Sequence, residues 1–234
     1  MHPTYNYIFH LINEFLSNDR KVSLVDYGCG NGLFLEYFPK GRILKYLGLD
    51  INLSSIDFAN KNYRSKKISF GLIRQGYPAK LGKPNSIDLI VLIGVLQYMS
   101  QKEIDLFLKE ARKVLRKDGR VIISCAVDHV PYRIFNIYRL LLPNYFINEE
   151  IFLSTVKKSD MKIIYKSEKG IFFAPLFSNV ISLFFDISDK IIFQTKGSLG
   201  PIGRFGRAMV NPILRLEYSL PINYGYTLFF VLKK

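Results

Sequence analysis

The 234-residue sequence has no tryptophan, only two cysteines and only three histidines. Cys29 and Cys125 are too few for the disulfide framework of a small secreted domain, and their spacing matches no zinc site. Acidic residues near the expected strand ends are too few and too scattered to form an oxygen-rich metal site. The sequence therefore predicts a cytoplasmic protein with reduced thiols and no metal centre.

Long apolar runs are also lacking. No run of about 18 or more apolar residues occurs, so no membrane-spanning helix is predicted. Residues 1–15 lack the basic start and the long apolar stretch of a signal peptide. The chain is nevertheless 49% hydrophobic, with a mean hydropathy of +0.11. Its length suits a single domain, residues 1–234, with a substantial core.

Acidic residues are scarce beside basic ones, with 19 Asp and Glu against 33 Lys and Arg. The resulting net charge of +14 attracts anions such as nucleic acid, anionic lipid or an acidic substrate. A general bias towards lysine explains the charge equally well. Neither an aromatic RNA-binding sequence, nor zinc-finger spacing, nor an Arg-rich tract accompanies it, which argues against nucleic acid as the partner.

The most informative segment is the glycine-rich run Asp26-Tyr27-Gly28-Cys29-Gly30-Asn31-Gly32, which follows apolar residues 22–25. Glycines allow a tight turn and a close approach of the backbone to a ligand. The helix expected from Leu33 begins with unpaired N–H groups. Asp50 ends the next apolar run, where its carboxylate can accept hydrogen bonds from two ribose hydroxyls. This arrangement predicts the first half of a nucleotide-binding βαβ unit.

The spacing of the glycines distinguishes between cofactors. A dinucleotide fingerprint, G-x-G-x-x-G/A, would need a small residue where Leu33 stands. The observed pattern is D-x-G-x-G-x-G, and Asp26 disfavours a pyrophosphate but suits the cationic sulfonium and amino group of S-adenosylmethionine. This pattern resembles the first motif of the class I S-adenosylmethionine-dependent methyltransferases. A tight turn that binds no ligand is the alternative.

The resemblance extends over residues 22–127. Ser86 to Val91 is similar to the family's fourth strand, Gly94 to Tyr98 to the turn after it, and Leu115 to Ile123 to the entry into its fifth strand. Strands are expected at 22–27, 44–50, 68–73, 87–93, 121–127, 161–166 and 226–232. Their alternation with helical patterns predicts an α/β, doubly wound, mostly parallel seven-stranded sheet. The resemblance implies a Rossmann-like methyltransferase fold with an antiparallel strand in the last pair.

One helix carries a complete set of end signals. Ser100 and Glu103 form a capping box, and an apolar stripe follows at helical spacing. Arg116 and Lys117 are expected in the last turn and Gly119 is expected to end the helix.

The resemblance also implies contacts with S-adenosylmethionine. Glycines 28, 30 and 32 would line its methionine portion, and Asp26 would help to hold its amino group. Asp50 would bind the ribose hydroxyls. The remaining contacts implied are Ile51 against the adenine, Gln75 to the adenine amine, and the backbone of Ile93 and Gly94 near the methionine amino group. Asp88, inside a strand, is given a structural role.

Candidates for a general base are few. His129 follows the fifth expected strand with Tyr132 close by, and His10 lies on an N-terminal segment, residues 1–20, that could cover the site as a lid. The alternatives are a solvated loop histidine at position 129 and an aromatic helix face around His10.

The insert at residues 170–221, before the last strand, combines an apolar stripe with basic residues. The stripe contains Val180, Phe184, Ile187 and Ile191, and the basic residues include Arg204, Arg207 and Arg215. This combination is typical of a helix on an anionic membrane, although an active-site cap or a dimer contact would look similar.

Taken together, the patterns predict a cytoplasmic S-adenosylmethionine-dependent methyltransferase, and the insert allows for peripheral association with the inner membrane face. Its acceptor would be a small molecule or a lipid-linked compound, methylated at oxygen. The alternatives are an RNA or protein methyltransferase, and a non-catalytic cofactor-binding partner subunit.

Overall fold

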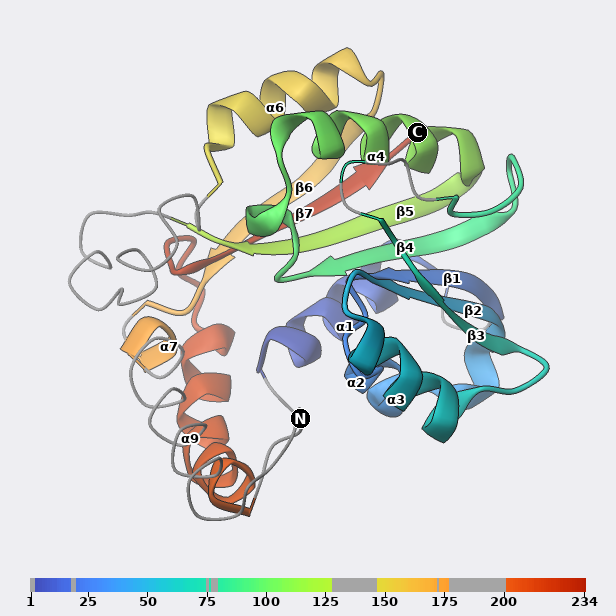
Figure 1. Ribbon diagram of the computed structural model, residues 1–234. Helices are drawn as coiled ribbons and strands as arrows, with labels where there is room; N and C mark the ends of the chain where they lie inside the picture. The colour runs from blue at the N-terminus through green and yellow to red at the C-terminus, as the bar shows by residue number, and fades with distance from the viewer. Residues whose placement is uncertain are drawn as a thin grey trace.

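The computed structural model describes residues 3–17, 20–74, 76, 80–127, 147–171, 173–176 and 201–234. A seven-stranded sheet forms its centre, with the strand order β3-β2-β1-β4-β5-β7-β6 (Figure 1). The strands are β1 (Val22–Tyr27), β2 (Ile43–Asp50), β3 (Ile68–Leu72), β4 (Ile87–Ile93), β5 (Leu115–Ala126), β6 (Lys162–Lys169) and β7 (Thr227–Lys233). β7 runs antiparallel to both of its neighbours, β5 and β6, and the other strand pairs of the sheet are parallel. The predicted fold class, including the antiparallel strand, is confirmed.

Helices cover both faces of the sheet (Figure 1). They are α1 (Pro3–Phe15), α2 (Leu33–Tyr37), α3 (Leu53–Tyr63), α4 (Gln101–Val114), α6 (Glu149–Lys158), α7 (Phe173–Leu176) and α9 (Pro201–Ser219), with 3₁₀ turns η1 (Lys40–Arg42) and η2 (Leu96–Tyr98). Helices α4 and α6 pack over one apolar cluster, and α1, α2 and α9 pack over the other. Each face of the sheet therefore has its own core, as a doubly wound fold requires.

The N-terminal helix α1 belongs to the core that it shares with α2 and α9. Ile8, Leu11 and Ile12 of α1 are fully buried against the sheet. The lid role of residues 1–20, and the boundaries of the insert at 170–221, stay predictions. Within the described residues, no helix combines the length and the apolar character needed to cross a bilayer.

Helix α4 confirms its predicted start but not its predicted end. The Ser100 hydroxyl accepts from the Glu103 backbone N–H, and the Glu103 carboxylate accepts from the Ser100 N–H, which completes the capping box. The helix stops at Val114 rather than near Gly119, so Arg116 and Lys117 lie in β5. The cause is long-range pairing: Leu115 is already extended and pairs with Ile87 on β4.

Gly119 has a packing role instead of a capping one. A Cβ atom at this position would lie 3.0 Å from the backbone oxygen of Ile87 and 2.8 Å from Cδ2 of Leu115. The two strands can approach this closely only because residue 119 has no side chain.

Asp88 joins three strands at the amino edge of the sheet. Its buried carboxylate accepts from the Ser23 N–H of β1 at 2.8 Å and from Arg116 of β5 at 2.9 Å. Arg20 adds an ion pair at 2.7 Å. Asp88 therefore lies at the opposite edge from the glycine turn, in accordance with a structural role.

Replacing Asp88 with Ala should lower the free energy of unfolding by about 2 kcal/mol, because the buried Ser23 N–H loses its acceptor and two arginines lose their counter-ion. The matched control is Asp105→Ala, which removes a more exposed carboxylate paired with Lys109 and should cost under about 1 kcal/mol. Urea unfolding of both variants checks this. Equal costs for the two variants would contradict the role given to Asp88.

Candidate active site

The glycine turn between β1 and α2 has backbone angles that favour glycine. Gly28 has a φ of 80° and Gly30 a φ of 50°. A Cβ atom on Gly28 would lie 2.1 Å from a methyl group of Val95, whereas a Cβ on Gly30 would meet nothing within 4 Å. Gly28 therefore permits a close approach of two loops, and Gly30 leaves open space beside the turn.

Asp50 connects this turn to the end of β2. Its Oδ2 accepts from the Gly30 N–H at 2.8 Å, and its Oδ1 accepts from the Asn52 N–H at 2.9 Å. The Asn52 side chain in turn caps α3 by accepting from the Ser55 N–H at 3.1 Å. Each carboxylate oxygen of Asp50 keeps a further lone pair, so two hydroxyl groups of a ligand can still donate to it.

A cavity of about 380 Å³ opens beside the turn. It is lined by Tyr27, Gly28, Asp50, Ile51, Asn52, Ile73, Arg74, Ile93, Gly94, Val95, Tyr98, Met99 and Glu103. These residues follow the carboxyl ends of β1, β2, β3 and β4 or belong to the start of α4. The cavity therefore lies where open α/β sheets bind their ligands. It brings Gly28, Asp50, Ile51, Ile93 and Gly94 together, and their contacts with a cofactor stay predictions.

Asp26 lies beneath the turn and does not line the cavity. Its side chain is buried, with 2% of the residue exposed, and accepts from the Tyr46 hydroxyl at 2.6 Å. The pKa of Asp26 is raised to about 7, mainly by burial; the Tyr46 hydrogen bond lowers this pKa in part, and the negative charge of Asp50 contributes to raising it. Two carboxylates thus place negative charge around one glycine turn, which suits a cationic ligand.

Glu103 has a second role that the sequence did not reveal. Besides capping α4, its Oε1 accepts from the Gly76 N–H at 2.8 Å and so holds the segment after β3 against the cavity. Burial raises the pKa of Glu103, but hydrogen bonds from Ser100 and Gly76 outweigh it and keep that pKa below its usual value. The capping motif identified this residue, but only the folded chain places Gly76 beside it.

Gln97 is another residue that sequence analysis did not assign. Its side-chain Oε1 is buried, and no described group of the protein donates to it. Its Nε2 lies near Gly94, 3.9 Å from a Cβ placed there. A buried acceptor beside the end of β4 fits a site that receives a donor from a ligand or water.

None of the predicted base candidates is among the described residues that line this cavity. His129 and Tyr132 lie outside them, as does Gln75. His10 is on α1 with 64% of its side chain exposed, and its Nε2 lies 3.5 Å from Glu14. His10 is not among the residues that line the cavity. The catalytic roles of these residues stay predictions.

Comparisons with known proteins agree with this geometry. Residues 25–123 match the family model described as a methyltransferase domain. The ubiquinone biosynthesis O-methyltransferase of Pelagibacter ubique (strain HTCC1062) is 27% identical over 106 residues, which are 45% of this chain. That match spans only 42% of the length of the relative.

Solved structures share the fold at low sequence identity. A putative sarcosine dimethylglycine methyltransferase from Galdieria sulphuraria has a TM-score of 0.66 at 12% identity, covering 99% of this chain and 85% of its own. The [4+2]-cyclase SpnF has a TM-score of 0.59 at 17% identity, covering 98% and 81%. These likenesses concern the fold alone.

The sheet order is that of the class I methyltransferase fold, and the glycine turn with its two acidic residues lies at the expected place for the cofactor. The match of residues 25–123 to a methyltransferase domain supports a class I S-adenosylmethionine-dependent methyltransferase. The described residues fit that cofactor. Open space lies beside Gly30, acceptors for two hydroxyls remain on Asp50, and the buried carboxyl group of Asp26, whose pKa burial raises to about 7, lies below the turn.

Replacing Asp50 with Ala should weaken binding of S-adenosylhomocysteine at least tenfold, because about two hydrogen bonds to a carboxylate, each worth about 1.5–3 kcal/mol, are lost. Asp57→Ala, on the exposed side of α3, is the control with the same change in charge. Calorimetric titration measures both. Unchanged affinity in a folded Asp50→Ala variant would show that this carboxylate does not hold the ribose.

Binding should also depend on pH through Asp26. Without cofactor its pKa is about 7, and a cationic ligand favours the carboxylate, so binding should release a proton near that pH. The affinity for S-adenosylmethionine should therefore rise as the pH increases through about 7. Calorimetry in two buffers of different ionisation enthalpy detects the proton. Asp26→Asn should lose both the proton release and this pH dependence, and a wild-type affinity independent of pH would refute the link.

Proposed function

We propose that this protein transfers a methyl group from S-adenosylmethionine to an oxygen atom of a small-molecule or lipid-linked acceptor. The observation that supports this most is the cavity that Gly28 and Asp50 line at the carboxyl edge of the sheet, where Asp50 accepts from the Gly30 N–H and Asp26 is buried beneath the turn. The similarity of 106 residues to an O-methyltransferase favours oxygen as the methylated atom.

In the proposed reaction, S-adenosylmethionine supplies an activated methyl group in an in-line displacement. The residues of the chain bind and orient: Asp50 holds the ribose, and Asp26 provides a negative environment for the amino group. Positioning of this kind accounts for much of the rate of a transfer between two bound groups. His129 is proposed to accept the proton that the acceptor hydroxyl loses.

Two other functions remain as alternatives. An RNA or protein methyltransferase would use the charge of +14 to bind its substrate. A non-catalytic cofactor-binding subunit would share the site but not the turnover, and the occurrence of a cyclase among proteins of the same fold illustrates that the fold does not settle the reaction. Turnover with small hydroxylated aromatic acceptors, but not with RNA, favours the proposal over both.

The exposed surface of α9 supports the proposal that the acceptor is located at a membrane. Four large apolar residues lie on its exposed side at helical spacing, Phe205, Met209, Ile213 and Leu216, with exposures of 69%, 63%, 44% and 68%. Leu214 and Tyr218 pack into the core from its other side. An exposed apolar stripe on a helix that also contains basic residues is typical of docking on anionic lipid. The predicted stripe at Val180, Phe184, Ile187 and Ile191 lies outside the described residues.

His129→Ala should lower the turnover number about a hundredfold while the affinity for S-adenosylhomocysteine stays close to that of the wild type. Transfer of a radiolabelled methyl group measures turnover, and calorimetry measures affinity. Wild-type activity in the variant would exclude His129 as the base. Loss of both activity and affinity would indicate a structural role instead.

Replacing both Phe205 and Leu216 with Ser should reduce sedimentation with anionic liposomes at least tenfold, because each side chain contributes about 1.5–3 kcal/mol when buried in lipid. The control is the pair Phe58→Ser and Ile151→Ser, which removes two exposed apolar residues from α3 and α6. Wild-type binding should weaken with salt. Absence of binding of the wild-type protein to anionic liposomes at low salt would contradict the membrane proposal.

A further inference from the structure

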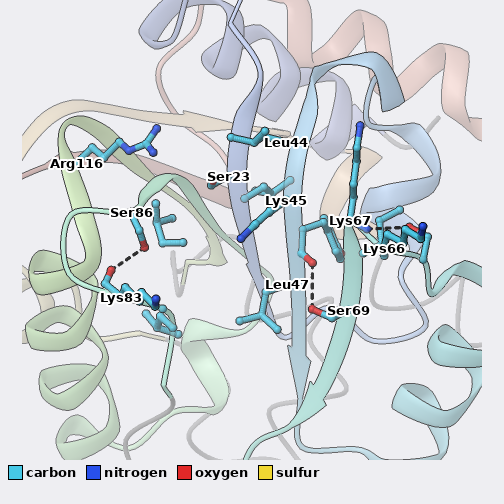
Figure 2. A pocket seen from close by; sticks show the side chains of 17 residues that line it. Ser23, Leu44, Lys45, Leu47, Lys66, Lys67, Ser69, Lys83, Ser86 and Arg116 are labelled. Carbon is cyan, nitrogen blue, oxygen red and sulfur yellow. Dashed lines mark hydrogen bonds between the residues drawn. The ribbon is translucent and has the colours of Figure 1, made fainter.

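A second cavity, of about 580 Å³, lies at the amino edge of the sheet, away from the glycine turn (Figure 2). The starts of β1, β2 and β3 and residues 81–87 before and at the start of β4 form its walls. Along β2, the distance from Leu44 in this cavity to Asp50 at the cofactor site is about 20 Å. A ligand held here is therefore too far away to receive the methyl group.

The described part of the connection between β3 and β4 borders this cavity. Parallel strands are usually joined by a helix that covers the sheet. Between β3 and β4, the described residues 73, 74, 76 and 80–86 contain no helix. Among the residues that line the cavity, Leu47, Leu81 and Ile87 are apolar and lie on the same face of the sheet as Lys45, whereas Leu44 and Ile68 lie on the other face.

The walls of this cavity carry positive charge. Lys45, Lys66, Lys67 and Lys83 are exposed residues that line it, and none of its described lining residues is acidic. Lys45 and Lys83 extend toward one another from opposite walls (Figure 2). Arg116 also lines the cavity, but Asp88 already neutralises it. Like charges that converge without a counter-ion repel each other, and an anion between them would remove that repulsion.

We propose that this cavity is an accessory binding site for a phosphate ester with an apolar body. The phosphate would lie between Lys45 and Lys83, and the apolar part would cover Leu47, Leu81 and Ile87, which are on the same face of the sheet. The size of the cavity and its mixture of apolar lining with a few convergent polar groups are those of small-molecule sites. The inference is independent of the proposed function, because it uses no residue of the cofactor site.

Octyl phosphate, used below the concentration at which it forms micelles, tests both halves of the site. Calorimetry at low salt should give saturable binding of octyl phosphate that is at least about tenfold tighter than binding of inorganic phosphate, with no binding of octanol. Lys45→Gln with Lys83→Gln should weaken octyl phosphate binding at least about tenfold. Lys61→Gln with Lys158→Gln, exposed lysines on α3 and α6, removes the same charge and should leave binding unchanged.

Binding of S-adenosylhomocysteine, measured in all three proteins, should be equal and shows that each is folded. The proposal would be overturned by no saturable binding of octyl phosphate, by equal weakening in both double variants, or by equal affinity for octyl phosphate and inorganic phosphate. Binding to anionic vesicles without binding of monomeric octyl phosphate would also overturn it, since the positive charge would then serve a lipid surface. Failure of S-adenosylhomocysteine to bind the wild type would instead count against the cofactor site alone.

Discussion

The hydrogen bond from the Gly30 N–H to the Asp50 carboxylate holds the cofactor site together. It fixes the glycine turn, which follows β1, to the end of β2. The adjacent bond from the Asn52 N–H positions the start of α3 from the same carboxylate. Because Gly28 also donates to the Leu49 carbonyl at 2.6 Å, the turn has little freedom to move. The cavity is therefore largely formed before a ligand arrives, which reduces the cost of ordering the site on binding.

The opposite edges of the sheet use buried carboxylates in different ways. Asp88 is surrounded by donors and cations and stabilises the junction of three strands. Asp26 has one hydroxyl donor and a second carboxylate nearby, so burial keeps its pKa near 7. The folded protein stabilises the charged form of Asp26 only weakly. A cationic ligand would stabilise that charged form, so the raised pKa of Asp26 in the free protein favours binding of such a ligand.

Much of the fold was predictable because local patterns and burial agree. β1 and β4 have the predicted bounds, since these largely apolar strands are buried on both faces. The start of β5 was not predictable, because Leu115 leaves the helix in order to pair with Ile87, which is distant in sequence. For the candidate site, the glycine spacing and Asp50 were sufficient to predict S-adenosylmethionine as the cofactor. The contact of Glu103 with Gly76 depends on tertiary structure, so no local pattern could indicate it.

The central claim is that the turn of Asp26 to Gly32 and Asp50 form a site for S-adenosylmethionine rather than for a dinucleotide. Calorimetric titration of the purified protein with S-adenosylhomocysteine and with NADH tests this most directly. We expect S-adenosylhomocysteine to bind with a dissociation constant in the micromolar range, a free energy of about 8 kcal/mol, and NADH to give no saturable heat. Tight binding of NADH with no response to S-adenosylhomocysteine would contradict the assignment.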